Sequence, residues 1–130
     1  MMETVGHYIY FMQLTIASSD GELEQQEIDD IVARAAEMQL FGMFSGMGHV
    51  NQGEVMEEAC HYHDAMVNSG QIVMAFAQAA GIIAASINPP YDREVLSEYY
   101  NSMITVAAAD GEIEPSERSL LEFVKAEWGV

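Results

Sequence analysis

Two stretches of the chain repeat one another: LTIASSDGELEQQE at residues 14–27 and ITVAAADGEIEPSE at residues 104–117. They align without a gap at an offset of 90, and seven of the fourteen aligned positions are identical. The three aliphatic positions exchange only Leu, Ile and Val. Identity of this density over so specific a string indicates an internal duplication.

Each copy has the pattern of a helix-turn-helix hairpin. A glycine suits the left-handed position that closes the first helix. Two glutamates suit the N-cap and the third position of the next helix, where their charge opposes the helix dipole. These residues are Gly21, Glu24 and Glu27 in the first copy and Gly111, Glu114 and Glu117 in the second, with Pro115 at the first helical position. Helix capping alone therefore explains part of the repeat.

Apolar residues recur every three or four positions along most of the chain, and no stretch alternates as a strand does. The predicted helices span about residues 5–19, 24–40, 54–67, 71–86, 92–109 and 115–128. We therefore predict an all-α fold in one domain over residues 1–130, a bundle of about six helices. Repeat units at about 5–40 and 92–130 surround a central pair at 54–87 and are related by a pseudo-twofold axis.

The most apolar run is 72–87, which is shorter than the roughly 20 residues that a membrane span needs. It predicts a buried helix that forms the centre of the bundle, where small residues such as Ala80 and Gly81 allow neighbours to approach closely. The Gly- and Met-rich stretch at 42–48 predicts a connector, whose methionines either fill the core or form an exposed binding surface.

The chain has four Lys and Arg against 21 Asp and Glu, a formal charge of −17. Such a charge disfavours nucleic acid and anionic membrane surfaces, which need basic residues to displace their counterions. Divalent cations and basic protein surfaces remain as ligands, although solubility alone also explains acidic surfaces. The single cysteine, Cys60, and the absence of a signal sequence at the acidic start favour a cytoplasmic location.

The two turns concentrate alternating carboxylates, which would repel one another by roughly 1 to 4 kcal/mol per close pair. A hard cation such as Ca²⁺ or Mg²⁺ would relieve that repulsion, because it prefers oxygen ligands. The predicted metal ligands are Asp20, Glu22, Glu24, Glu27, Asp110, Glu112, Glu114 and Glu117. The glycine stands second rather than sixth, so the turns are not EF-hands. The alternative is that these residues serve only as helix caps and solvated charge.

The two A-x-x-D-G-E-[IL]-E-x-x-E strings resemble the TerB family of tellurite-resistance-like proteins. The resemblance covers roughly residues 5–40 and 92–130 and implies a helical bundle with an inner repeat, a link to stress response and membrane-associated protein partners. In that family the paired Asp and Glu are suspected of binding metal. By the resemblance, the functional carboxylates would be Asp20, Glu24, Glu27, Asp110, Glu114 and Glu117.

Other chemistry is weakly signalled. Cys60, His61, His63 and Asp64 lie together in one predicted helix. Glu57, Cys60, His61 and Asp64 share a face by three- and four-residue spacing, which is either a soft-metal face or a half-exposed polar face, while His63 points to a different side from His61. Adjacent Cys60 and His61 cannot act as nucleophile and base. No phosphate-binding or nucleophile motif occurs. Three functions remain: a non-catalytic module that binds a divalent cation, a protein partner or both; a metal-dependent hydrolase; and a ligand-free structural or homo-oligomerising bundle.

Overall fold

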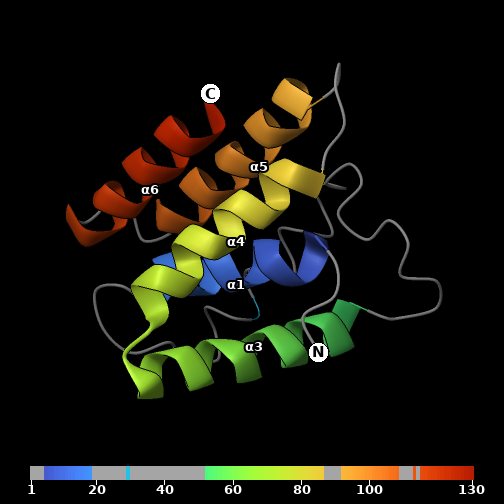
Figure 1. Cartoon of the computed structure of the whole chain (residues 1–130), viewed down its shortest axis with the longest axis vertical. Helices are drawn as coiled ribbons and strands as arrows, with labels where there is room; N and C mark the ends of the chain where they lie inside the picture. The colour runs from blue at the N-terminus through green and yellow to red at the C-terminus, as the bar shows by residue number, and fades with distance from the viewer. Residues whose placement is uncertain (1–4, 19–28, 30–51, 87–91, 109–112, 114) are drawn as a thin grey trace.

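The computed structural model describes residues 5–18, 29, 52–86, 92–108, 113 and 115–130 (Figure 1). This part of the chain contains helices and no strand, which confirms the all-α class. The helices are α1 (Val5–Ser18), α3 (Gln52–Ser69), α4 (Ile72–Ser86), α5 (Asp92–Ala107) and α6 (Pro115–Trp128). Each lies within about two residues of a range predicted from apolar periodicity.

Part of the sequence analysed above lies outside the described residues: the predicted second helix at 24–40 except residue 29, the connector at 42–48 and both Asp-Gly turns. The described ends of the two copies agree in register. Helix α1 ends at Ser18, which aligns with residue 108, and α5 ends at Ala107. The aligned threonines also make the same bond, because Thr15 Oγ1 donates to the Phe11 carbonyl at 2.8 Å and Thr105 Oγ1 to the Asn101 carbonyl at 3.0 Å. The pseudo-twofold axis itself stays a prediction.

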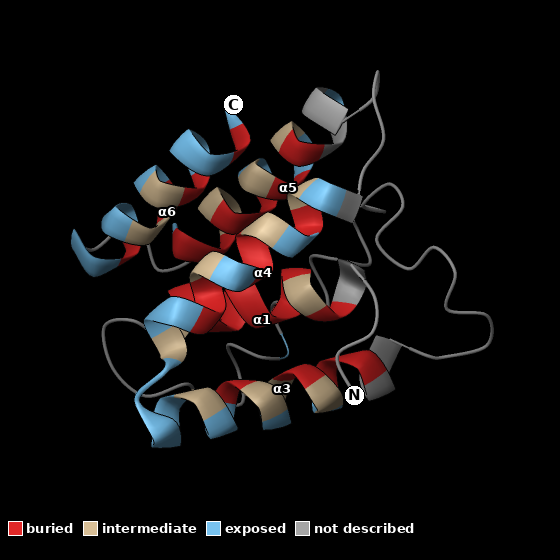
Figure 2. Cartoon of the chain, viewed as in Figure 1, coloured by how far each residue is buried: buried red, intermediate tan, exposed pale blue. Residues whose placement is uncertain are grey.

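Helix α1 is the centre of the bundle. It contacts α3, α4, α5 and α6, and α3 lies on the opposite side of it from α5 and α6 (Figure 1). Every residue from Ile9 to Ile16 is buried, so burial extends round the helix rather than along one stripe (Figure 2). Residues Tyr10, Phe11 and Met12 supply three large, fully buried side chains.

The prediction that α4 is the most buried helix was wrong. Its inner side is buried, with Ala75, Phe76, Ala79, Ala80 and Ile83 all in the core. Its other side alternates between intermediate and exposed residues in Figure 2. The prediction failed because an apolar helix is covered only where neighbours reach it, and α3, α1 and α6 contact α4 from its inner side.

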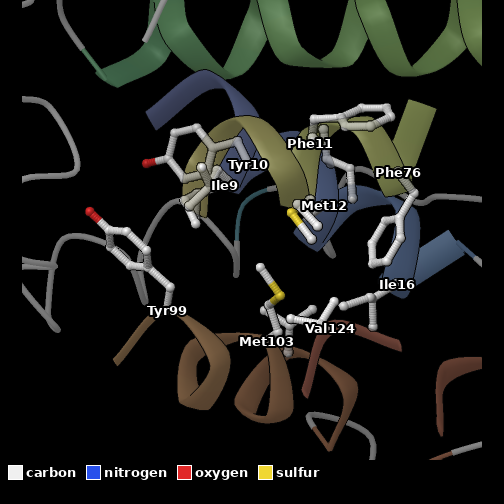
Figure 3. Packing of buried hydrophobic residues seen from close by; sticks show 14 of the residues in the cluster. Ile9, Tyr10, Phe11, Met12, Ile16, Phe76, Tyr99, Met103 and Val124 are labelled. Carbon is white, nitrogen blue, oxygen red and sulfur yellow. The ribbon is translucent and has the colours of Figure 1, made fainter. Parts of the chain in front are cut away.

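The core surrounds α1 and is formed between this helix and its neighbours α3, α4, α5 and α6. Figure 3 shows Met12 facing Met103 and Val124, with Phe76 of α4 beside Ile16. The buried residues of α5 and α6 include Tyr99, Met103 and Val106, and Leu121, Val124 and Trp128, which recur at three- and four-residue spacing. The Trp128 indole N–H donates to the Ala80 carbonyl at 2.9 Å, which ties the end of α6 to the middle of α4.

Glycines end two helices in the left-handed conformation. Gly70 follows α3 with φ 74°, and the bonds Gly70 N to Val67 O and Gln71 N to Met66 O form a Schellman motif. Gly129 ends α6 in the same way, with φ 67°. The tight turn at Gly70 joins α3 directly to α4.

Candidate functional site

Glu117 is the one predicted metal ligand that lies within the described residues. It lies in the first turn of α6, which begins at Pro115, and Glu117 is only 4% exposed. Glu117 shares the buried stripe of α6 with Leu121, Val124 and Trp128, at spacings of four, three and four residues. A carboxylate is therefore directed inward at the end of the second acidic turn.

Burial of this carboxylate has two physical explanations. An ionised carboxylate is costly to bury unless hydrogen bonds or a cation compensate its charge. At the start of α6, the first backbone N–H groups and the positive end of the helix dipole supply part of that compensation. A cation held together with the preceding carboxylates is the second explanation, so capping and metal binding both fit Glu117. By contrast, Glu122 and Glu127 on the same helix are exposed.

The other seven predicted ligands are outside the described residues: Asp20, Glu22, Glu24, Glu27, Asp110, Glu112 and Glu114. Described residues flank these positions in sequence. Helix α1 leads into the first turn at Ser18, and half-buried Ile113 packs against the core between the second turn and α6.

The polar residues of α3 do not form a metal site. Across the described part of the chain, no three His, Cys, Asp or Glu side chains come together to hold a metal ion. His61 and Asp64 are exposed while His63 is buried, so the helix turns them apart. The Cys60 thiol is half-buried, and its pKa is raised by burial first and by Asp64 and Glu57 second. The raised pKa disfavours the thiolate form, which binding of a soft metal or a nucleophilic reaction needs.

A serine-histidine contact joins α1 to α3 and was not found by sequence analysis. Ser18 Oγ lies 3.0 Å from His63 Nε2, and the residues are 45 positions apart. His63 is 4% exposed, and its ring packs edge-on near Phe11 with centroids 6.2 Å apart. Burial lowers the pKa of His63, and the nearby Asp64 carboxylate opposes that effect. The histidine is therefore held neutral at the base of the first acidic turn.

Ser18, His63 and Asp64 are the residue types of a hydrolytic triad, but their geometry differs from one. Asp64 Oδ1 is 3.8 Å from His63 Nδ1, too far for the hydrogen bond that orients a catalytic imidazole. Asp64 is largely exposed, and His63 Nδ1 has no hydrogen-bond partner. Ser18 also stands at the carboxyl end of α1, where a helix presents carbonyl groups rather than the N–H donors of an oxyanion hole. The contact is best explained as a polar link between helices.

Two further polar pairs hold α1 in place. His7 Nε2 lies 2.8 Å from Glu58 Oε2 of α3, and the histidine is 3% exposed. On the opposite side, Gln13 Nε2 donates to Ser102 Oγ of α5 at 3.0 Å, and Ser102 donates on to the Tyr99 carbonyl. Sequence periodicity missed these pairs because each joins positions more than 50 residues apart on a helix that reads as apolar.

The described fold and the acidic turns define a class of protein: helical bundles that carry carboxylate-rich hairpins. The chain belongs to the TerB family, since the family model described as "Tellurite resistance protein TerB" matches residues 9–130. Comparison with curated proteins and with solved structures found no match to this chain. TerB is not a known enzyme family. Within the described residues, no helix combines the length and apolar character that crossing a membrane requires.

Proposed function

We propose that this TerB-family chain is a non-catalytic acidic binding module whose turns hold a divalent cation, Ca²⁺ or Mg²⁺, and that it engages a protein partner. The observation that carries the proposal is buried Glu117 at the start of α6. It lies seven residues after Asp110 of the repeated string, on the inward side of its helix. Three other carboxylates precede Glu117 in the string, and together the four form the oxygen-rich donor set that hard cations prefer.

The charge of the whole chain supports a cationic ligand. With a formal charge of −17, the protein raises the local concentration of divalent cations and of basic protein surfaces. We propose that the partner presents such a basic surface. As the family resemblance implies, we also propose that this partner is membrane-associated and that the two proteins act together in a stress response. The cation would reduce repulsion among the turn carboxylates and fix the hairpins that face that partner.

The test is thermal unfolding at constant ionic strength with Ca²⁺, Mg²⁺ or Na⁺. A cation that binds only the folded state raises its stability, by roughly 2.7 kcal/mol at 100 times the dissociation constant. We expect the melting temperature to rise with a divalent cation and not with Na⁺, because constant ionic strength removes general screening.

A matched pair of variants on α6 distinguishes a site from general charge. Glu117→Gln should abolish the divalent-specific rise, whereas Glu122→Gln, which removes the same charge from an exposed position, should keep it. Asp20→Asn combined with Asp110→Asn should also abolish it. Equal shifts in all the proteins would overturn the proposal and reduce these residues to helix caps and solvated charge.

A further inference from the structure

Helix α3 forms a layer of its own at one side of the bundle. It contacts α1 and α4, and it lies on the opposite side of α1 from α5 and α6 (Figure 1). Its buried residues recur at helical spacing and include Val55, Ala59 and His63, so a histidine occupies a position in an otherwise apolar stripe. Helix α3 can therefore move away from α1 while α5 and α6 keep their contacts with that helix.

Two histidine contacts hold α3 to the two ends of α1. His7, in the first turn of α1, lies 2.8 Å from Glu58 Oε2 of α3. Ser18, the last residue of α1, lies 3.0 Å from His63 Nε2 of α3. A carboxylate accepts a hydrogen bond from a histidine in either protonation state, whereas a hydroxyl adds no charge that would balance a protonated ring. The Ser18–His63 contact is therefore the one that acid weakens.

The helices packed against α3 bring no charge to His63. The groups of α1 that meet its ring are the Ser18 hydroxyl and the Phe11 ring. Helix α1 has no Asp, Glu, Lys or Arg, and α4 has no titratable side chain. The titratable residues of α1 are His7, Tyr8 and Tyr10. His7 is paired with Glu58, and tyrosine hydroxyls are uncharged below about pH 8.

On α3 itself, Asp64 is the charged group that acts on the His63 ring. Its Oδ1 is 3.8 Å from His63 Nδ1, and its side chain is largely exposed. Cys60, one turn earlier, stays uncharged because burial first, and Asp64 and Glu57 second, raise the pKa of its thiol. A protonated His63 would thus be buried opposite one carboxylate that solvent screens. Burial lowers the pKa of His63, and Asp64 opposes that effect.

We propose that α3 is an acid-released layer, in which protonation of buried His63 frees α3 from α1 while α5 and α6 remain packed on the other side of α1. In the open form, water solvates the charged ring, so protons favour opening. Release would uncover the side of α1 that carries Phe11, whose ring packs against Tyr62 of α3 at 4.8 Å between centroids. The chain would then expose apolar surface in response to acid.

The size of the effect follows from proton linkage. In the open form His63 titrates near its ordinary pKa of 6.5, and in the closed form it titrates lower. At about one pH unit below 6.5, protonation favours the open form by at most about tenfold, and less if the closed form also binds some protons. Carboxylates remain largely ionised there, so the histidines are the groups that titrate.

The experiment is amide hydrogen exchange of the full chain, followed by NMR at about pH 7.5 and pH 5.5 and expressed as protection factors, which remove the pH dependence of intrinsic exchange. We expect the α3 amides to be less protected than the best-protected amides of α5 and α6 at both pH values. Between the two, α3 protection should fall by about three- to tenfold. His63→Gln should abolish this fall, and His61→Gln, at an exposed position of the same helix, should keep it.

A second variant tests the same device from its exposed side. Asp64→Asn removes the carboxylate that favours a charged His63, so the fall in α3 protection should become larger. A smaller fall would overturn the proposal, as would α3 protection that is equal at both pH values or that falls equally in His63→Gln. Amides of α3 that are as protected as those of α5 and α6 would also overturn it, because α3 would then open only when the whole chain unfolds.

Discussion

Helices α1 and α4 are alike in sequence and opposite in environment. They contain 14 and 15 residues, and neither has an Asp, Glu, Lys or Arg. Nevertheless, α1 is buried from Ile9 to Ile16 while α4 exposes Val73, Met74 and Ile82 (Figure 2). Apolar character therefore predicts that a helix packs against others, but the number of neighbours decides how much of it is covered.

Side-chain size explains which helix became central. Helix α1 contributes large side chains on several sides, including Tyr10, Phe11 and Met12, and these can fill the space between four neighbours. The buried side of α4 combines three small residues, Ala75, Ala79 and Ala80, with only two large ones, Phe76 and Ile83. A hydropathy count weighs both helices alike, since it ignores volume.

The largest expected effect comes from truncating one apolar side chain to alanine in each of the two helices. Phe11→Ala removes a fully buried ring that packs edge-on against Tyr62 at 4.8 Å between centroids, so unfolding free energy should fall by about 3 to 5 kcal/mol. Val73→Ala removes an exposed side chain and should change it by at most about 0.5 kcal/mol. Urea unfolding measures both, and a loss above about 1 kcal/mol for Val73→Ala would show that the exposed side of α4 is covered within one chain.

A smaller effect, dependent on pH, should distinguish the two helices. His63 of α3 packs against α1: its Nε2 contacts Ser18 and its ring lies near Phe11. On the other side of the ring, Nδ1 is 3.8 Å from Asp64 Oδ1. The pKa of His63 is lowered from 6.5 in the folded state, mainly by burial. Between the folded and unfolded pKa values, the unfolded chain therefore binds more protons than the folded chain. The contribution of His63 to the free energy of unfolding is fully present above pH 6.5 and is lost as pH falls towards the folded pKa.

Urea unfolding at about pH 7.5 and pH 5.5, on either side of the unfolded pKa, tests this sign. Wild type should lose stability at the lower pH, and His63→Gln should lose less because its side chain does not titrate. His61→Gln is the matched control, since His61 is exposed on the same helix. If all three proteins lose the same stability, the pH dependence comes from other groups and not from the contact between α1 and α3.

Sequence patterns predicted the helices well and the contacts between them poorly. Periodicity located α5 and α6 and their buried residues, because each pattern is local. The repeat and the resemblance predicted the family, which the match over residues 9–130 confirms. The Ser18–His63 and Gln13–Ser102 contacts could not be predicted, because no local spacing relates residues on different helices. Of the predicted metal ligands, only Glu117 lies within the described residues, and its burial follows from the stripe that begins with it.

The smallest expected effect is a gain of stability from Gly81→Ala. Gly81 lies inside α4 without a positive φ, and an added Cβ would meet nothing within 4 Å, so alanine fits the folded chain without strain. Alanine also restricts the unfolded chain, and the free energy of unfolding should rise by about 0.4 to 1 kcal/mol. The measurement is thermal or urea unfolding of wild type and Gly81→Ala under the same conditions. A loss of stability would contradict the prediction and show that a neighbour within the chain already approaches this glycine.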